Sequence, residues 1–362
     1  ASELYGQEGN TRLRIRSAQL CESMMEKLPA SPYTVRAGFR AIAEYRAISR
    51  WAEANQVAQK LIQKRLPIDK VQQFELHHLM AQSYAAQSQW ANAVESMRKA
   101  RSFKDDSALY AAQISYMHNA GLKPQQIENE VRGMAAKFPN DRRRWEVLLY
   151  LGHAHARENN PILAAASIQP ALANAANSGN MAYYYVLWMV DEANAARGKA
   201  VSAQAEAQKN LENAKTDEKF KRDAFNKAGS PEARKAAQTA LVEATKLVQQ
   251  RQQELQKAQA SSRDAEAKFR KQVTDSDRAL NTAVGKAKAS ENFGAVLALR
   301  YALARTLYRE RVKDEAKALT HAREVSKETH LYSSKQQTLI NDLLTGQPDG
   351  DQFRKDVAML LK

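Results

Sequence analysis

Apolar and polar residues alternate with the period of an α-helix along most of this chain. Apolar side chains recur every three or four residues, and short polar turns separate the helical stretches. Glycine (13) and proline (9) are scarce for 362 residues, and alanine dominates the 44% of hydrophobic residues. Because alanine favours helices and few residues interrupt them, the pattern predicts an all-α fold.

One segment shows a pair of helices with unusual clarity, "LMAQSYAAQSQWANAVESMRKA" at residues 79–100. Small and large apolar residues fall at regular places in it: Ala81, Tyr84, Trp90, Ala93, Met97 and Ala100. Small residues let two antiparallel helices approach closely, while large ones fill the gap to the next pair. We therefore expect Ala93 to lie where two helices touch.

This segment resembles the tetratricopeptide repeat, a helix–turn–helix unit of about 34 residues. Weaker copies occupy residues 41–67, 114–140, 149–175 and 303–322. Their matching positions are Tyr45, Trp51, Ala54, Ala58 and Leu61, then Leu151, Gly152, Ala164, Ile168 and Ala171, then Leu303, Ala304 and Ala316. The resemblance covers residues 33–190 and 291–330 and implies an α-solenoid, whose core forms only when the units stack. Helical hairpins without that ancestry are the alternative.

Between residues 193 and 290, large apolar residues give way to Ala, Gln, Lys and Glu. A narrow apolar seam with the spacing of a coiled coil remains in the second half: Leu241, Ala244, Val248, Leu255, Ala258, Ala265 and Phe269. The first half has a weaker seam at Ala200, Ala207, Leu211, Ala214 and Phe225, interrupted by Gln204, Glu218 and Lys221. These seams predict two long helices paired as an antiparallel coiled coil, with a disordered linker as the alternative.

The turn between the two arms lies in "FNKAGSPEARKAAQ", residues 225–238. Gly229 is expected to end the first arm in a left-handed conformation, Ser230 to cap the second, and Pro231 and Glu232 to occupy its first turn. The predicted organisation is an N-terminal helical segment (1–32), tetratricopeptide-like repeats (33–192), an inserted hairpin (193–290, tip near 229–231) and C-terminal helices (291–362).

Motifs for catalysis, cofactors or metal ions are missing from the sequence. It contains no glycine-rich phosphate loop, no GxSxG elbow and no cysteine pair, and the single Cys21 is expected to be a buried structural thiol. His77 with His78, and His153 with His155, lack the spacing of helical metal ligands. We expect a protein that is not an enzyme and holds no cofactor.

The tetratricopeptide resemblance implies a concave groove lined by the first helix of each repeat. The positions that match it carry a basic, mixed set of side chains: Arg36, Phe39, Arg46, His78, Gln82, His153 and Arg157, with Glu75, Glu146 and Leu149 beside them. The set lacks the Lys and Asn residues with which some relatives bind a C-terminal carboxylate. Solvated helix faces without a ligand are the alternative.

The hairpin tip gathers basic residues and aromatic rings: Lys219, Lys221, Arg222, Phe225, Lys227, Arg234 and Lys235, with Phe220 among them. Such a tip suits contact with phosphates or with an acidic protein surface. A solvated, lysine-rich coiled coil has the same composition.

A net charge of +15, from 55 Lys and Arg against 40 Asp and Glu, is dispersed along the chain and favours weak attraction to anions. The leading hypothesis is a protein-interaction scaffold or adaptor that binds a peptide or helix in its groove and a second partner, or itself, through the hairpin. The alternatives are a binder of nucleic acid or envelope polysaccharide, and a peptide-sensing regulator.

The compartment is predicted from composition. The alanine-, glutamine- and lysine-rich arms resemble those of bacterial envelope proteins, and the start "ASELYGQEGN" fits removal of an export signal. No stretch of eighteen apolar residues occurs, so no transmembrane segment is expected. The sequence thus favours a periplasmic protein of a secretion or envelope assembly, with the cytoplasm as the alternative.

Overall fold

The structure is a computed structural model, and it describes residues 11–64, 66–174 and 178–331. These residues form helices and connecting turns, with no strand among them, and the predicted all-α class is confirmed. The chain divides into two compact units, Ala1–Ala171 and Leu172–Lys362, which are described separately below.

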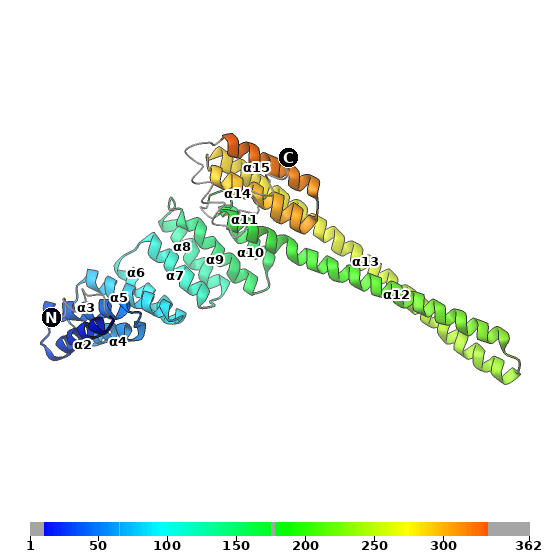
Figure 1. Ribbon diagram of the computed structural model, residues 1–362, viewed down its shortest axis with the longest axis horizontal. Coiled ribbons are helices and arrows are strands. Elements are labelled where there is room, and N and C mark those ends of the chain that lie inside the picture. Colours follow the sequence, from blue (N-terminus) through cyan, green and yellow to red (C-terminus); the bar gives the residue numbers. More distant parts are fainter. Residues whose placement is uncertain (1–10, 65, 175–177, 332–362) are drawn as a thin grey trace. The chain divides into compact units, whose positions relative to one another are not determined.

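The first unit is a series of helices that pack on their neighbours in the chain (Figure 1). It contains α2 (Thr11–Lys27), α3 (Pro32–Ala47), α4 (Trp51–Gln63), α5 (Lys70–Ala86), α6 (Trp90–Phe103), α7 (Ser107–Asn119), α8 (Pro124–Lys137), α9 (Arg143–Arg157), α10 (Pro161–Ile168) and the 3-10 turn η1 (Gln169–Ala171). Its main contacts join helices that are adjacent or next but one in sequence. That arrangement is an α-solenoid of helical hairpins.

The hairpins share one type of turn. Ser49, Ser88, Gly121 and Asn159 have positive φ angles of 59°, 57°, 73° and 57° and follow α3, α5, α7 and α9. After each of them, the next N–H donates to a carbonyl five positions earlier, as from Arg50 to Tyr45 and from Gln89 to Tyr84. This left-handed ending satisfies the last carbonyls of the helix and reverses the chain.

The core of the first unit contains the positions predicted from the clearest repeat. Ala81, Ala93, Met97 and Ala100 are all 0% exposed. A separate cluster joins α2 to α5 and includes Cys21, which is buried. The described part of the predicted N-terminal helical segment 1–32 is α2, which packs against α3 in that cluster. Residues 1–10 lie outside the described residues.

The second unit is built around two long antiparallel helices, α12 (Glu192–Lys227) and α13 (Pro231–Ala289). Before them come α11 (Ser178–Val186) and a π-helical segment, η2 (Leu187–Asp191). After them come α14 (Phe293–Tyr301), a second π-helical segment, η3 (Ala302–Val312), and α15 (Glu315–Leu331). Within this unit, α12 and α13 run side by side away from α11, α14 and α15 (Figure 1). Since α11 and α14 contact each other, the predicted inserted hairpin is confirmed.

The seam between the arms follows the predicted heptads. Leu211, Ala214, Ala244, Leu255 and Phe269 are buried. The residues that interrupt the first seam, Gln204, Glu218 and Lys221, also lie on it and are half-buried. Glu218 accepts a hydrogen bond from the Thr245 hydroxyl at 3.0 Å, so a polar residue there links the arms.

The turn at the hairpin tip differs from the prediction in one respect. Gly229 does not have a positive φ; Ala228 instead leaves α12 in an extended conformation (φ −67°, ψ 117°), which reverses the chain without a left-handed residue. Ser230 accepts from the Ala233 N–H at 3.1 Å, and Pro231 opens α13, both as predicted.

α12 begins at Glu192, next to the predicted start of the hairpin at residue 193. The two compact units divide earlier, at 171/172, because α11 packs on α14 and η3 with Met181 and Val186 buried. The second arm extends beyond the coiled coil, since Leu280, Ala283 and Val284 near the end of α13 are buried where that helix packs on α14. The last part of the predicted C-terminal segment, residues 332–362, lies outside the described residues.

Candidate functional site

Three of the seven predicted groove residues meet in one hydrogen-bonded cluster. Arg46, near the end of α3, donates through Nη2 to Oε1 of Gln82 on α5 at 2.5 Å. The Gln82 side-chain amide lies 3.0 Å from Nε2 of His78, one helical turn earlier on α5. The spacing of four residues places His78 and Gln82 on the same face of α5. We refer to these three residues as the Arg46 cluster.

Aromatic rings surround the Arg46 cluster. The guanidinium carbon of Arg46 lies 5.9 Å from the centre of the Trp51 ring, and Phe74 stacks on His78 with ring centres 5.5 Å apart. Lys104 Nζ lies 5.3 Å from the centre of the Phe74 ring. Phe74 and Lys104 were not predicted as site residues. Phe74 lies one turn before His78 on α5, and this spacing of four residues could have predicted from the sequence that the two rings share a face.

The electrostatics of the Arg46 cluster are positive. Burial lowers the pKa of Arg46 and the pKa of His78. The positive charges of Arg46 and Lys104 lower the pKa of His78 further, and the negative charge of Glu75 opposes them with a smaller effect. His78 is therefore neutral at neutral pH, whereas Arg46 keeps its charge. Nε of Arg46 is sealed from solvent without a hydrogen-bond partner, and no described carboxylate forms an ion pair with this side chain.

His153 and Arg157 belong to a second group, at the end of α7. The rings of His118 and His153 lie 5.6 Å apart, and His118 also contacts Tyr150 at 5.4 Å. Arg157 donates to the carbonyl oxygens of His118 at 2.8 Å and of Leu122 at 3.4 Å. The first carbonyl lies in the last turn of α7 and the second in the turn after it, so Arg157 stabilises a helix end, a role the groove prediction did not anticipate.

The other groove positions play simpler parts. Arg36 is exposed, whereas Phe39 packs against the hydrophobic cluster formed by α2 to α5. His77 stacks on Phe103, with ring centres 6.0 Å apart. Across the described residues, no group of three or more His, Cys, Asp or Glu side chains is arranged to hold a metal ion.

The predicted tip residues are mostly exposed. Lys219, Arg222, Lys227, Arg234 and Lys235 are exposed, and Lys221 and Phe225 are half-buried. Arg222 pairs with Glu218 at 2.9 Å, Lys221 lies 4.0 Å from Asp217, and Arg234 lies over the Phe225 ring at 5.4 Å. Acidic neighbours thus neutralise part of the charge, while the Phe220 ring is 68% exposed.

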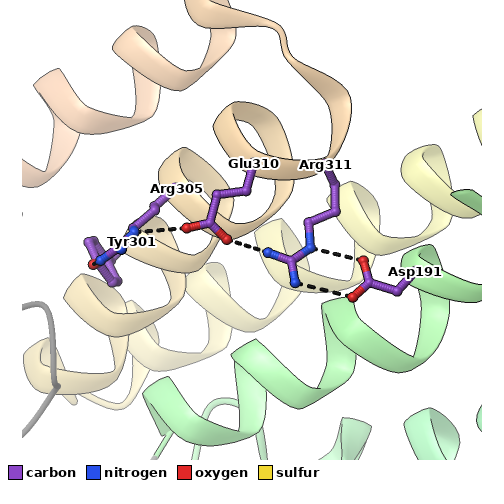
Figure 2. A network of polar contacts seen from close by, with 5 residues as sticks. All are labelled: Asp191, Tyr301, Arg305, Glu310 and Arg311. Atoms are coloured by element: carbon purple, nitrogen blue, oxygen red, sulfur yellow. Dashed lines mark hydrogen bonds and ion pairs between the residues drawn. The ribbon is translucent and has the colours of Figure 1, made fainter.

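A polar network at the base of the hairpin was not predicted (Figure 2). Arg311 donates to both carboxylate oxygens of Asp191, at 2.9 and 3.1 Å. Glu310 pairs with Arg311 and with Nε of Arg305 at 2.9 Å, and Arg305 also donates to the Tyr301 hydroxyl at 2.5 Å. The network joins η2 to η3, and Asp191 and Arg311 are 120 positions apart, too far for a local sequence pattern to reveal.

Comparisons with known proteins place this chain in no family. No family model matches it, and no curated protein matches it. Among solved structures, a monomeric mutant of IFIT1 determined with Gppp-AAAA is 12% identical, with 99% of this chain and 79% of that chain covered, at a TM-score of 0.28. A likeness this weak carries no functional inference. No described helix combines the length and apolar character needed to cross a membrane.

Proposed function

We propose that this protein is a non-enzymatic interaction scaffold or adaptor with two separate binding regions. Its solenoid helices are proposed to be tetratricopeptide-like repeats, and their inner face, around the Arg46 cluster, binds a peptide or a helix of a partner. The hairpin formed by α12 and α13 contacts a second partner or another copy of the chain. Two binding regions on one chain let the protein hold two partners together.

The observation that carries this proposal is the hairpin itself. Its seam is closed by its own side chains, so α12 and α13 pair without help from another molecule. The 36 residues of α12 extend roughly 54 Å at about 1.5 Å per residue, far more than a connection between α11 and α14 requires. The tip carries an exposed Phe220 among basic residues, a composition suited to an acidic protein surface.

The setting we propose is a secretion or envelope assembly of a bacterium, in the periplasm. This part of the proposal rests on composition: polar, alanine-rich arms, of the kind that bridge the envelope. The cytoplasm is the alternative compartment. Fractionation of cells that make the protein from its full natural gene would distinguish them.

The second candidate function is binding to an anionic polymer, either nucleic acid or polysaccharide. Exposed Lys219, Lys227 and Lys235 favour it, because none of them forms an ion pair within the described structure. The paired Arg222 and Lys221 disfavour it, since charges already neutralised by acids release fewer counterions on binding.

Affinity purification from the native cell tests the scaffold proposal. Three baits are compared with and without nuclease treatment: the intact chain, a variant lacking residues 201–262, and a full-length variant with Lys221, Arg222, Arg234 and Lys235 changed to Glu. We expect one set of proteins to depend on the hairpin and another to remain with the deletion variant. Loss of every partner on nuclease treatment would contradict the proposal and favour the polymer binder.

A further inference from the structure

We infer that Arg46 is the anchor of the peptide site and that it binds the carboxylate of an Asp or Glu side chain in the partner peptide. The inference rests on the proposed function and names the chemistry of the ligand at the same face. It starts from an imbalance in the first unit: a half-buried guanidinium that has a neutral amide, Gln82, as its hydrogen-bond partner.

Cations elsewhere on α3 and α4 have acidic partners. Arg40 pairs with Glu44 at 2.5 Å, and Lys60 pairs with Glu22 at 2.7 Å and with Glu26 at 2.6 Å. Arg46 has no acidic partner within the described structure, whereas its closed-off Nε is a feature that it shares with Arg40. Removing a charge from water without a counter-charge is unfavourable, so an anion supplied by a ligand recovers free energy at this place.

The surroundings of Arg46 suit a single carboxylate. Gln82 and the Trp51 ring hold the guanidinium in place, which reduces the entropy lost when an anion binds. Lys104, over Phe74, adds a second positive charge to the same neighbourhood, although Asp106 lies 3.9 Å from its Nζ. The half-buried rings of Trp51 and Phe74 provide apolar surface for the residues that flank the acid.

A polyphosphate backbone fits this site less well than a peptide does. Nucleic acid needs several unpaired cations along a path, because each neutralised phosphate contributes a share of the affinity. Here Lys60 is paired with acids, Arg50 is paired with Glu53, and exposed Glu75 lies beside His78. The guanidinium of Arg46 has no acidic partner and is surrounded by paired charges and aromatic rings. Such a site favours a peptide that carries one carboxylate on an otherwise apolar or neutral segment.

The test uses random peptides of about twelve residues displayed on phage and selected on the intact chain. Parallel selections use Arg46→Gln, Arg46→Lys and the control Arg98→Gln, which removes an exposed arginine of α6 that pairs with Glu95. Circular dichroism verifies that each variant is folded. Selected peptides are then synthesised with their acid and with the matching amide, and all affinities are measured by calorimetry.

We expect peptides selected on the wild type and on Arg98→Gln to share one Asp or Glu position. Changing that acid to its amide should weaken binding to the wild type about 10- to 100-fold, as for a charge-assisted hydrogen bond, and should have little effect on Arg46→Gln. Arg46→Lys should keep the preference for acid in weaker form, because lysine retains the charge and loses the fork of donors.

Three results would overturn the inference. Peptides that bind the wild type without an acidic position would remove Arg46 as the anchor and leave the peptide-binding scaffold intact. An acid preference that persists in Arg46→Gln would place the anion elsewhere. Failure to select any peptide on the wild type would contradict peptide binding itself, and the inference would fall with the proposed function.

Discussion

Asp191 and Arg311 meet through two hydrogen bonds, at 2.9 and 3.1 Å, although 120 positions separate them in the chain. Asp191 ends the π-helical segment that leads into α12, and Arg311 lies near the end of the π-helical segment η3 (Figure 2). The hydrogen bond with Asp191 is the main reason that the pKa of Arg311 is raised. The pair therefore ties the start of the hairpin to the helices beneath it.

Breaking this pair should destabilise the second unit. Arg311 is 15% exposed, so Asp191→Ala leaves a largely buried guanidinium with only one of its two acidic partners, Glu310, and should lower the free energy of unfolding by about 1–3 kcal/mol. A double-mutant cycle with Arg311→Ala measures the coupling, using urea unfolding followed by circular dichroism. Glu315→Gln, which removes a more exposed pair with Arg309, is the control and should change stability by about 1 kcal/mol or less. Additive single effects of Asp191→Ala and Arg311→Ala would show that the pair contributes no coupling.

Removing only the coiled-coil part of the hairpin should leave both units folded. Arg197 and Glu266 lie 3.7 Å apart across the arms, so a short flexible linker can replace residues 201–262. A longer deletion through Gly285 also removes Leu280, Ala283 and Val284 from the core beneath the hairpin. We expect the short deletion to melt cooperatively and the long one to be insoluble or molten. An insoluble short deletion would show that the arms belong to the core.

The sequence predicted the features that depend on local periodicity and small residues. The heptads located the seam of the hairpin, and the spacing of Ala81, Ala93, Met97 and Ala100 located one repeat core. It did not predict the helix ends at Ser49, Ser88 and Asn159, because those left-handed positions carry residues other than glycine. The converse holds at Gly229, which was predicted to be left-handed and is not. A glycine permits a left-handed conformation and does not require one.

The candidate site was less predictable than the fold. The resemblance to a known repeat placed Arg46, His78 and Gln82 on one face, and the structure joins them by hydrogen bonds. It could not show that Arg157 stabilises the end of α7, since that role depends on a backbone carbonyl 39 positions away. Contacts of this range depend on how helices pack, which local patterns do not specify.

Ala93 provides a direct test of the repeat core. It is 0% exposed, so Ala93→Phe should overpack the contact and lower stability by about 1–3 kcal/mol. Ala91 lies in the same turn of α6 and is exposed, which makes Ala91→Phe the matched control. Thermal melting of the two variants decides the matter. Equal melting temperatures would show that Ala93 does not lie at a close helix contact.

His118 should make stability fall in mild acid. Burial, with smaller effects of Arg157 and His153, lowers the pKa of His118 to about 4, whereas an unfolded histidine has a pKa of about 6.5. Because the pKa is lower in the folded state, His118 makes its full contribution to stability above about pH 6.5, and that contribution is lost as the pH falls toward about 4. Allowing for partial exposure, His118 should account for about 1–2 kcal/mol of lost stability at pH 5. Urea unfolding at pH 7 and pH 5 should show a smaller difference for His118→Gln than for the wild type, and an equal difference would contradict this assignment.

The most direct test of the scaffold account is a salt titration of nucleic-acid binding by the intact chain. A committed binder loses about 10³-fold or more in affinity between roughly 50 and 200 mM salt and still binds tightly at physiological salt. Because Arg222 pairs with Glu218 and the charges of the chain are dispersed, we predict only non-specific binding, with a Kd near 10⁻⁴–10⁻⁶ M at about 150 mM salt. Changing Lys221, Arg222, Arg234 and Lys235 to Glu should abolish this weak non-specific binding, while protein partners of the solenoid remain attached. Nanomolar binding to a defined nucleic acid at about 150 mM salt, lost in the four-residue variant, would contradict the scaffold account in favour of the polymer binder.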